Sequence, residues 1–245
     1  MPSWRGCSLH PRDGPIWRLW STAGWMRRNF WHGSNPGMGY ERDGNDPYLY
    51  PGTEVLRNLE GLKEEQSLSG FETEAVLFRH VQLLARPVPG NFDLAHLKAI
   101  HRHLFQNVYA WAGELRMVDI SRGVSRFATH HFLESYSHGV FARLAEERTQ
   151  WRQKGVPTDF PECLAEYLGE INAMHPFREG NGRTQRAFIG CLAAAHGFQI
   201  LWEKMDQHSM TRASILSMQG DDRMLADLLG KNLRPDATAK QHRKD

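Results

Sequence analysis

Apolar side chains recur at helical spacing through most of the chain. Leu97, Ile100 and Leu104, for example, would line one face of a helix. The pattern predicts helices at residues 71–84, 93–105, 130–153, 159–174, 182–196 and 210–229. Because strands do not alternate with these segments and no internal repeat is present, a parallel sheet is not expected. The pattern indicates an all-α fold, built as a helical bundle.

One segment, residues 117–129, departs from the helical pattern. Val118 and Ile120 alternate with polar neighbours and a glycine follows at a turn, so the segment predicts a β-hairpin. The exposed edge of a two-stranded hairpin becomes useful if an extended target peptide pairs with it. The residues expected to form this docking flap are Ile120, Ser121, Arg122, Gly123, Val124, Ser125, Arg126 and Phe127. Phe127 has two interpretations, since it would either clamp the target or pack the hairpin onto the core.

Two of the predicted helices meet in a loop with the sequence HPFREGNGRTQR, residues 175–186. Asp159 is placed to cap the first of these helices. Pro176 disfavours helical geometry at the preceding residue, so the helix should end at His175.

The glycines of this loop favour a binding site for an anion. Gly180 and Gly182 permit a tight turn and a close approach of the backbone to a ligand. The second helix should begin near Asn181 and stop at Gly197. Its first N–H groups and its dipole would both face the loop and favour negative charge there.

The side chains of the loop are those that nucleotide chemistry requires. His175 has a pKa near neutrality in its ordinary state and would act as the general base for an incoming hydroxyl. Glu179 offers a hard oxygen ligand for Mg²⁺. Arg183 and Arg186 lie on one helical face and match phosphate oxygens, and Asn181 would donate its amide to the phosphate under attack. Positioning and charge stabilisation are what nucleotidyl transfer mainly needs.

The whole string resembles the signature of the Fic family, H-P-F-x-[DE]-G-N-G-R-x-x-R, at every fixed position. The resemblance implies a Fic fold, with a hairpin flap over the active site, and transfer of AMP from ATP to a protein hydroxyl. It gives His175, Glu179 and the two arginines the same roles, makes the Gly-Asn-Gly turn the anion hole, and makes Phe177 the anchor of the loop. Relatives that phosphorylate carry Lys where this chain has Gly182, so AMP transfer is favoured.

The resemblance covers residues 46–230 approximately. The segments at 48–62 and 109–116, the second reading YAWAGELR, are similar to family segments around the first two core helices. We therefore expect a Fic domain at residues 45–233, followed by a polar tail at 234–245.

Residues 1–44 are expected to be a poorly ordered extension. They are rich in Trp and Arg, with almost no acid and no helical or strand period. The preferred interpretation is disorder, or translated sequence upstream of a true start at Met26 or Met38. A signal peptide and a segment that touches a membrane surface are the alternatives.

Composition agrees with one enzyme domain. The chain has 245 residues and a net charge of +2, which gives no electrostatic case for binding nucleic acid. Cys7, Cys163 and Cys191 form no pattern, which favours a reducing cytoplasm over a disulfide framework. No apolar run reaches the roughly 20 residues that a membrane span needs.

An absence in the sequence bears on regulation. Many Fic proteins are blocked by a helix with the motif [ST]-x-x-x-E-[GN], and neither Glu60 nor Glu179, which precede glycines here, fits it. The resemblance then implies the toxin class, in which a small separate antitoxin carries the inhibitory Glu and contacts Arg186. It also implies a possible target, the ATPase subunit of a type II topoisomerase. The alternatives are another nucleotide donor, removal of AMP, or a silent interaction module.

Overall fold

The computed structural model describes residues 46–122 and 125–236. The predictions made for residues 1–44, for Gly123 and Val124, and for the tail beyond residue 236 lie outside these ranges. Seven α-helices are present among the described residues: α2 (Glu65–Ala85), α3 (Leu94–Phe105), α4 (Leu133–Lys154), α5 (Phe160–Met174), α6 (Asn181–Ala195), α7 (Gln207–Ser217) and α8 (Arg223–Asn232). The prediction of an all-α bundle is confirmed.

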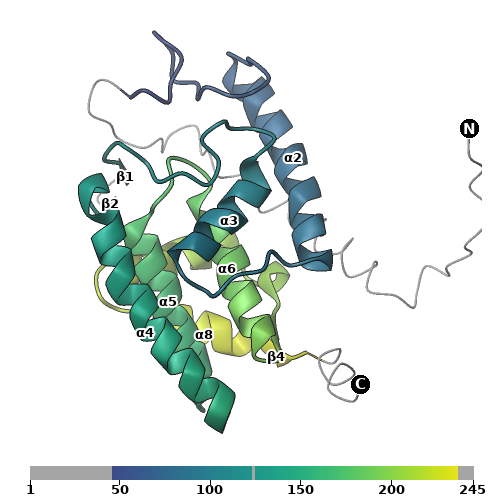
Figure 1. The fold of residues 1–245 in the computed structure, drawn as a ribbon, viewed down its shortest axis with the longest axis vertical. Coiled ribbons are helices and arrows are strands. Elements are labelled where there is room, and N and C mark those ends of the chain that lie inside the picture. The colour runs from purple at the N-terminus through teal and green to yellow at the C-terminus, as the bar shows by residue number, and fades with distance from the viewer. Residues whose placement is uncertain (1–45, 123–124, 237–245) are drawn as a thin grey trace, which may run out of the picture.

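Helix α5 lies at the centre of the bundle, because apolar residues cover most of its circumference. Leu164, Ile171 and Met174 have no exposed surface. The helix contacts α4, α6 and α8, and Figure 1 shows α4, α5 and α6 running side by side. Helix α2 packs on α3, which in turn packs on α6. The loop between α5 and α6 therefore lies at one end of the core, held by helices from both halves of the chain.

Most predicted helices are present, with changes at their ends. Asp93 caps α3 as its side chain accepts a hydrogen bond from His96 N at 2.8 Å. Asp159 stands at the N-cap of α5 but makes no capping hydrogen bond, so that prediction was wrong. The residues from His130 to Phe132 form a short 3₁₀ turn (η1) before α4 begins. A second 3₁₀ turn, η2 (Trp202–Lys204), precedes α7.

The single helix predicted at residues 210–229 is two helices, α7 and α8. The break falls at Gly220, whose φ of 87° is a left-handed conformation that favours glycine. Within the described ranges, no helix combines the length and the apolar character needed to cross a bilayer.

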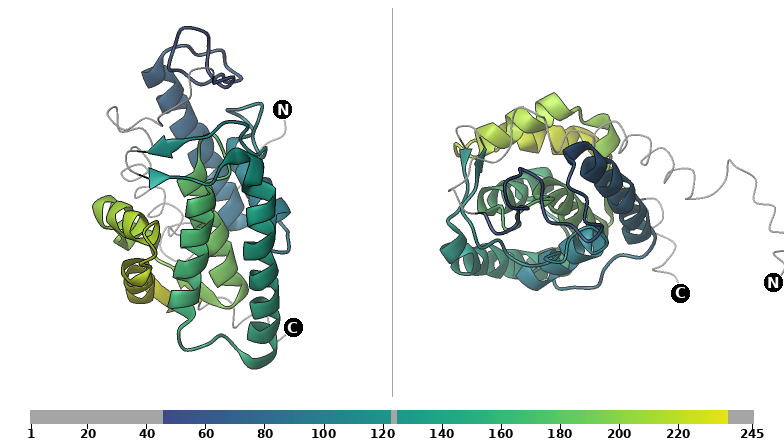
Figure 2. Two further views of the ribbon diagram at one scale, coloured as in Figure 1. Left: turned by 90° about the vertical axis from the view of Figure 1, so that its left-hand side faces the viewer. Right: turned by 90° about the horizontal axis from the view of Figure 1, so that it is seen from above.

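Two small antiparallel hairpins complete the fold. The predicted flap is present as β1 (Ser121–Arg122) and β2 (Ser125–Arg126), with Ser121 opposite Arg126. Figure 2 shows this hairpin extending beside the upper end of the bundle. The second hairpin was not predicted and pairs β3 (Phe198–Ile200) with β4 (Leu233–Pro235). Strand β4 includes Arg234 and Pro235, where the polar tail was expected to begin.

Candidate active site

His175 lies at the C-terminal end of α5 in a left-handed conformation, with φ 45° and ψ 60°. This conformation is uncommon for a residue with a side chain, and it follows from Pro176, which excludes the helical region at the residue before it. The predicted end of the helix is confirmed. The turn carries the imidazole from the end of α5 towards the loop that leads into α6.

The tautomer of His175 is fixed by its surroundings. Nδ1 lies 3.1 Å from the carbonyl oxygen of Asn172, which can only accept, so Nδ1 carries the proton and the lone pair is on Nε2. Burial lowers the pKa of His175 to about 3, and the charges of Arg122 and Arg116 act in the same direction. The imidazole is therefore neutral at physiological pH and holds the lone pair that a general base needs.

Phe127, at the end of the flap, stacks on the imidazole of His175. The ring centroids are 3.7 Å apart and the planes differ by 17°. The flap therefore lies directly over the candidate base, as expected. This contact shows that Phe127 packs against the site in the absence of a target. Its action as a clamp stays a prediction.

Arg116 forms hydrogen bonds with both arms of the flap and with the loop between α5 and α6 (residues 175–180, here called the catalytic loop). Its side chain is 2% exposed, and Nε donates to the carbonyl of His175 at 2.8 Å. Nη1 donates to Val118 O at 2.7 Å and Nη2 donates to Ala128 O, one on each side of the hairpin. The backbone N–H of Arg116 donates to Pro176 O at 2.9 Å. In the sequence, Arg116 stands out only as the last residue of a family-like segment.

Asn181 has a structural role that was not predicted. Its side chain is buried, with Oδ1 accepting from Phe177 N at 2.9 Å and Nδ2 donating to Phe177 O at 2.7 Å. The amide thus closes the loop on itself, and donation of its second N–H to a phosphate stays a prediction. Phe177 is 1% exposed and stacks on His101 at 3.8 Å, which confirms it as the anchor of the loop.

His101 on α3 supports the loop from the other side. Gly113 N–H donates to its Nδ1 at 2.8 Å, so Nε2 carries the proton and donates to the carbonyl of Glu179 at 3.0 Å. A second support is the buried ion pair between Arg178 and Asp46, at 2.6 Å. Neither was predicted, because each depends on how distant segments pack.

The two glycines serve different purposes. Gly180 has φ 79°, and a Cβ there would lie 2.2 Å from the ring of Phe105, so both the turn and the packing require glycine. Gly182 lies in the first turn of α6, where a Cβ would meet only Arg186 Nη1, at 3.3 Å. The tight turn predicted at Gly180 is therefore present, whereas the close approach of a ligand to the two glycines stays a prediction.

Arg183 is surrounded by two carboxylates and an aromatic ring. Its Nη2 is 3.3 Å from Glu179 Oε1, and its Nη1 is 2.6 Å from Oε1 of Glu72 on α2. The guanidinium carbon lies 4.7 Å from the centre of the Phe105 ring. Glu72 was missed, although a carboxylate between Leu68 and Val76 on the buried face of α2 was a signal in the sequence.

Arg186 follows one turn later and is half-buried. Burial lowers its pKa to about 10, and the positive charge of Arg183 adds to the effect. Both arginines remain charged at neutral pH. Two cations at the start of α6, with the N-terminal end of its dipole, make this a site for a polyanion.

The residues present fit a nucleotide with Mg²⁺. The ion typically takes one or two carboxylates together with the phosphates of its substrate. Glu179 supplies a carboxylate beside the two arginines, and its Oε1 accepts from Gly180 N at 2.8 Å. Glu179 would hold the ion, which would neutralise charge on the phosphates when bound.

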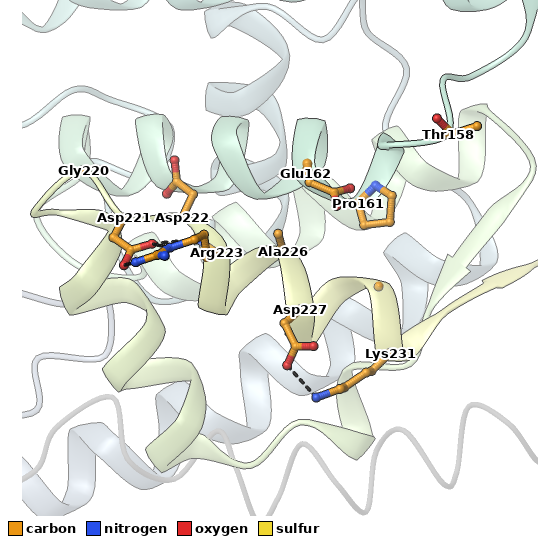
Figure 3. Close-up of a pocket in the computed structure, with 11 residues that line it drawn as sticks. Thr158, Pro161, Glu162, Gly220, Asp221, Asp222, Arg223, Ala226, Asp227 and Lys231 are labelled. Atoms are coloured by element: carbon orange, nitrogen blue, oxygen red, sulfur yellow. Dashed lines mark hydrogen bonds and ion pairs between the residues drawn. The ribbon is translucent and has the colours of Figure 1, made fainter.

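A groove elsewhere on the molecule is excluded from this site. Figure 3 shows it between the start of α5 and α8, lined by Glu162, Asp221, Arg223, Asp227 and Lys231 among others. Four of its charges form two ion pairs, Asp221 with Arg223 at 2.7 Å and Asp227 with Lys231 at 2.6 Å. The catalytic loop follows the opposite end of α5.

Comparisons with known proteins agree with this geometry. The family described as Fic/DOC matches residues 91–193. The probable protein adenylyltransferase y4lH of Sinorhizobium fredii is 38% identical over 72% of this chain and 90% of that protein. The probable protein adenylyltransferase Fic of Escherichia coli is 35% identical over 73% of this chain and 88% of that protein.

Longer relatives and solved structures are also similar. The protein adenylyltransferase VbhT of Bartonella schoenbuchensis is 42% identical, and the match spans 77% of this chain but only 39% of that protein. The crystal structure of BepC from Bartonella tribocorum, with bound AMPPNP, has a TM-score of 0.69 at 29% identity and covers 77% of this chain and 96% of that chain. The chain belongs to the Fic/DOC family.

Proposed function

We propose that this protein transfers AMP from ATP to a hydroxyl side chain of a target protein. The observation that carries the proposal is the placement of a neutral His175, with its lone pair on Nε2, at the loop that opens into the cationic start of α6. Relatives that are named protein adenylyltransferases support it.

The reaction assigns each group a task. The hydroxyl oxygen of a target Tyr, Thr or Ser forms a bond to the α-phosphorus as the bond to the β-phosphate oxygen breaks. The hydroxyl proton passes to Nε2 of His175, and pyrophosphate leaves. Arg183 and Arg186 stabilise the negative charge that develops on the leaving group. When bound at Glu179, Mg²⁺ would supply further charge neutralisation.

The test is incubation of the purified protein with ATP labelled at the α-phosphate, in a bacterial lysate. We expect a labelled protein band, with AMP on a hydroxyl side chain identified by mass spectrometry. His175→Ala should lower transfer by roughly 10²–10⁴-fold while ATP binding is retained. Near wild-type transfer by this variant would overturn the assigned mechanism.

The same experiment separates the alternatives. Parallel incubations with labelled UTP and CTP would reveal another donor, and loss of AMP from a modified protein would reveal the reverse reaction. Gly182 favours AMP transfer on the family resemblance, because relatives that phosphorylate carry Lys at this position. Binding of nucleotide without any transfer would identify a silent interaction module.

We further propose that the protein acts as a cytoplasmic toxin whose inhibitor is a separate small antitoxin. The support is the lack of an inhibitory [ST]-x-x-x-E-[GN] motif in the sequence and the position of Arg186 on α6, one turn after Arg183. The ATPase subunit of a type II topoisomerase is the proposed target, on the family resemblance.

A further inference from the structure

Glu72 is a carboxylate on the buried face of α2, outside the catalytic loop. It follows Leu68 by one helical turn and precedes Val76 by another, and both are buried. Its side chain is 13% exposed, and its Oε1 lies 2.6 Å from Nη1 of Arg183. A carboxylate in this position is held by the packing of α2, so it has little freedom to leave the guanidinium.

The second oxygen of Glu72 is also held. The hydroxyl of Tyr109 donates to Oε2. Burial raises the pKa of Tyr109 well above its usual value, and the charge of Glu72 adds to this, so the hydroxyl keeps its proton. The Tyr109 ring stacks on Trp111 with centroids 4.3 Å apart. Tyr109, itself held by its stacking on Trp111, therefore fixes the direction of the carboxylate.

Glu179, in contrast, has more than one task. Its Oε1 lies 3.3 Å from Arg183 Nη2 and also accepts from Gly180 N. The same carboxylate is the candidate ligand for Mg²⁺, and a metal ion would compete with Arg183 for its oxygens. Arg183 then needs another partner to stay in place. Glu72 is such a partner, because it contacts Nη1, the other terminal nitrogen of the guanidinium.

We propose that Glu72 is a positioning residue for the nucleotide. It holds Arg183 in the direction that serves the phosphates and allows Glu179 to turn to the metal, an inference that rests on the proposed function. A guanidinium has five N–H donors, and the contact with Glu72 uses one end of the fork only. Once Glu179 turns to the metal, the donors of Nη2 become available to phosphate oxygens while the pair with Glu72 stays intact.

The opposite effect would follow if Glu72 competed with phosphate for Arg183. Glu72 would then be an internal brake, and removing its charge would strengthen binding of nucleotide. The hydrogen bond from Tyr109 favours a positioning role for Glu72. A carboxylate that is held at both oxygens keeps the Arg183 guanidinium in place and does not move with it. The two effects differ in sign, so one variant distinguishes them.

The test is Glu72→Gln, which keeps the shape of the side chain and removes its charge. Calorimetry would measure the Kd of ADP in the presence and in the absence of Mg²⁺, on protein shown to be folded by circular dichroism. We expect ADP to bind about 10- to 100-fold more weakly, the range for a lost charge-assisted contact. The Mg²⁺ concentration that gives half of the maximal transfer rate should also rise.

Two further variants control the interpretation. Tyr109→Phe removes only the hydroxyl and should shift the Kd of ADP in the same direction, by a smaller factor. Glu74→Gln, on the exposed face of the same helix, should leave the Kd and the Mg²⁺ requirement unchanged. If Glu72→Gln does not fold, Glu72→Asp tests the same contact with the charge retained but drawn back by one carbon.

Two outcomes would overturn the inference. An unchanged Kd and Mg²⁺ requirement in folded Glu72→Gln would make Glu72 a purely structural residue, and tighter binding of ADP would make it a brake. Failure of the proposed function is recognised separately. The wild-type protein would then bind ADP but transfer no AMP, whatever the effect of the Glu72 substitution.

Discussion

The imidazole of His175 is held in place by three neighbours of different kinds. Asn172 fixes its tautomer, Phe127 covers one face of the ring, and Arg116 binds the carbonyl of the same residue. A general base must be oriented as well as neutral; these contacts orient the ring, and its burial keeps it neutral.

Buried neutral histidines make the stability of the protein depend on pH. The pKa of His175 and of His101 is lowered to about 3, and that of His80 to about 4, in each case mainly by burial. Between pH 6.5 and about 4 the unfolded chain binds protons that the folded protein does not, so the free energy of unfolding should fall as pH falls through this window. Urea denaturation at pH 7 and at pH 5 would measure this change in the free energy of unfolding. Equal values, after allowance for the carboxylates, would contradict the neutral state of these residues.

Glu179→Ala tests the proposed Mg²⁺ site through a single side chain. We expect Mg²⁺-dependent transfer to decrease and to recover in part at high Mg²⁺, because the phosphates of ATP still bind the ion. Titration of the transfer rate with Mg²⁺ is the measurement. Undiminished transfer by the intact protein in the presence of a chelator would exclude this role for Glu179.

At the scale of elements, the flap is attached to the site at its base and at its end. Arg116 binds the carbonyls on both sides of the hairpin, and Phe127 stacks on His175. A target segment that pairs with the exposed edge of the flap would displace or reorient Phe127 to reach the base. On the proposed function, the flap would align the acceptor and the start of α6 would bind the donor.

Phe127→Ala should separate these two functions. We expect slower transfer to the target protein with little change in the affinity for ATP, since the donor site lies on α6. Calorimetry with an ATP analogue and a transfer assay on the same preparation provide the comparison. Matched losses in binding and transfer would show that the hairpin is needed for the structure of the whole site.

At the scale of the whole molecule, the proposed toxin role predicts toxicity. Expression of the chain alone should slow bacterial growth, and coexpression of a small helical protein with [ST]-x-x-x-E-G should restore it. The Glu would pair with Arg186 in a contact of roughly 1.5–3 kcal/mol. Growth curves and AMP transfer, with the Glu of the partner changed to Gly, are the measurements. If the lone chain with an intact motif is inactive and the partner has no effect, a toxin with an external inhibitor is excluded.

The sequence predicted the elements better than their contacts. The loop at residues 175–186 was recognisable because its groups are adjacent in the chain, and the flap because a short alternating segment interrupts helices. Glu72 and Arg116 act on the loop from more than 50 positions away, and only the packing of α2, α3 and the segment at residues 109–116 brings them there. The two hydrogen bonds by which the Asn181 amide closes the loop were not predicted either, because they depend on the shape of the folded turn.

Two errors had local causes. The break between α7 and α8 was signalled by Gly220 followed by two aspartates, but the apolar spacing on both sides concealed it. Strands β3 and β4 have three residues each, too few for an alternating pattern to be recognised, and they pair across more than 30 residues.

The pairing of β3 with β4 has a consequence for how the domain can be joined to other domains. Asp236 N donates to the carbonyl of Gly197 at 2.8 Å, so the described chain leaves the fold beside the C-terminal end of α6. The catalytic loop is at the other end of this helix. Because α6 has 15 residues, its two ends are about 22 Å apart. A partner domain, a surface linker or a fluorescent reporter attached beyond this point would therefore leave the entrance for the target protein unobstructed.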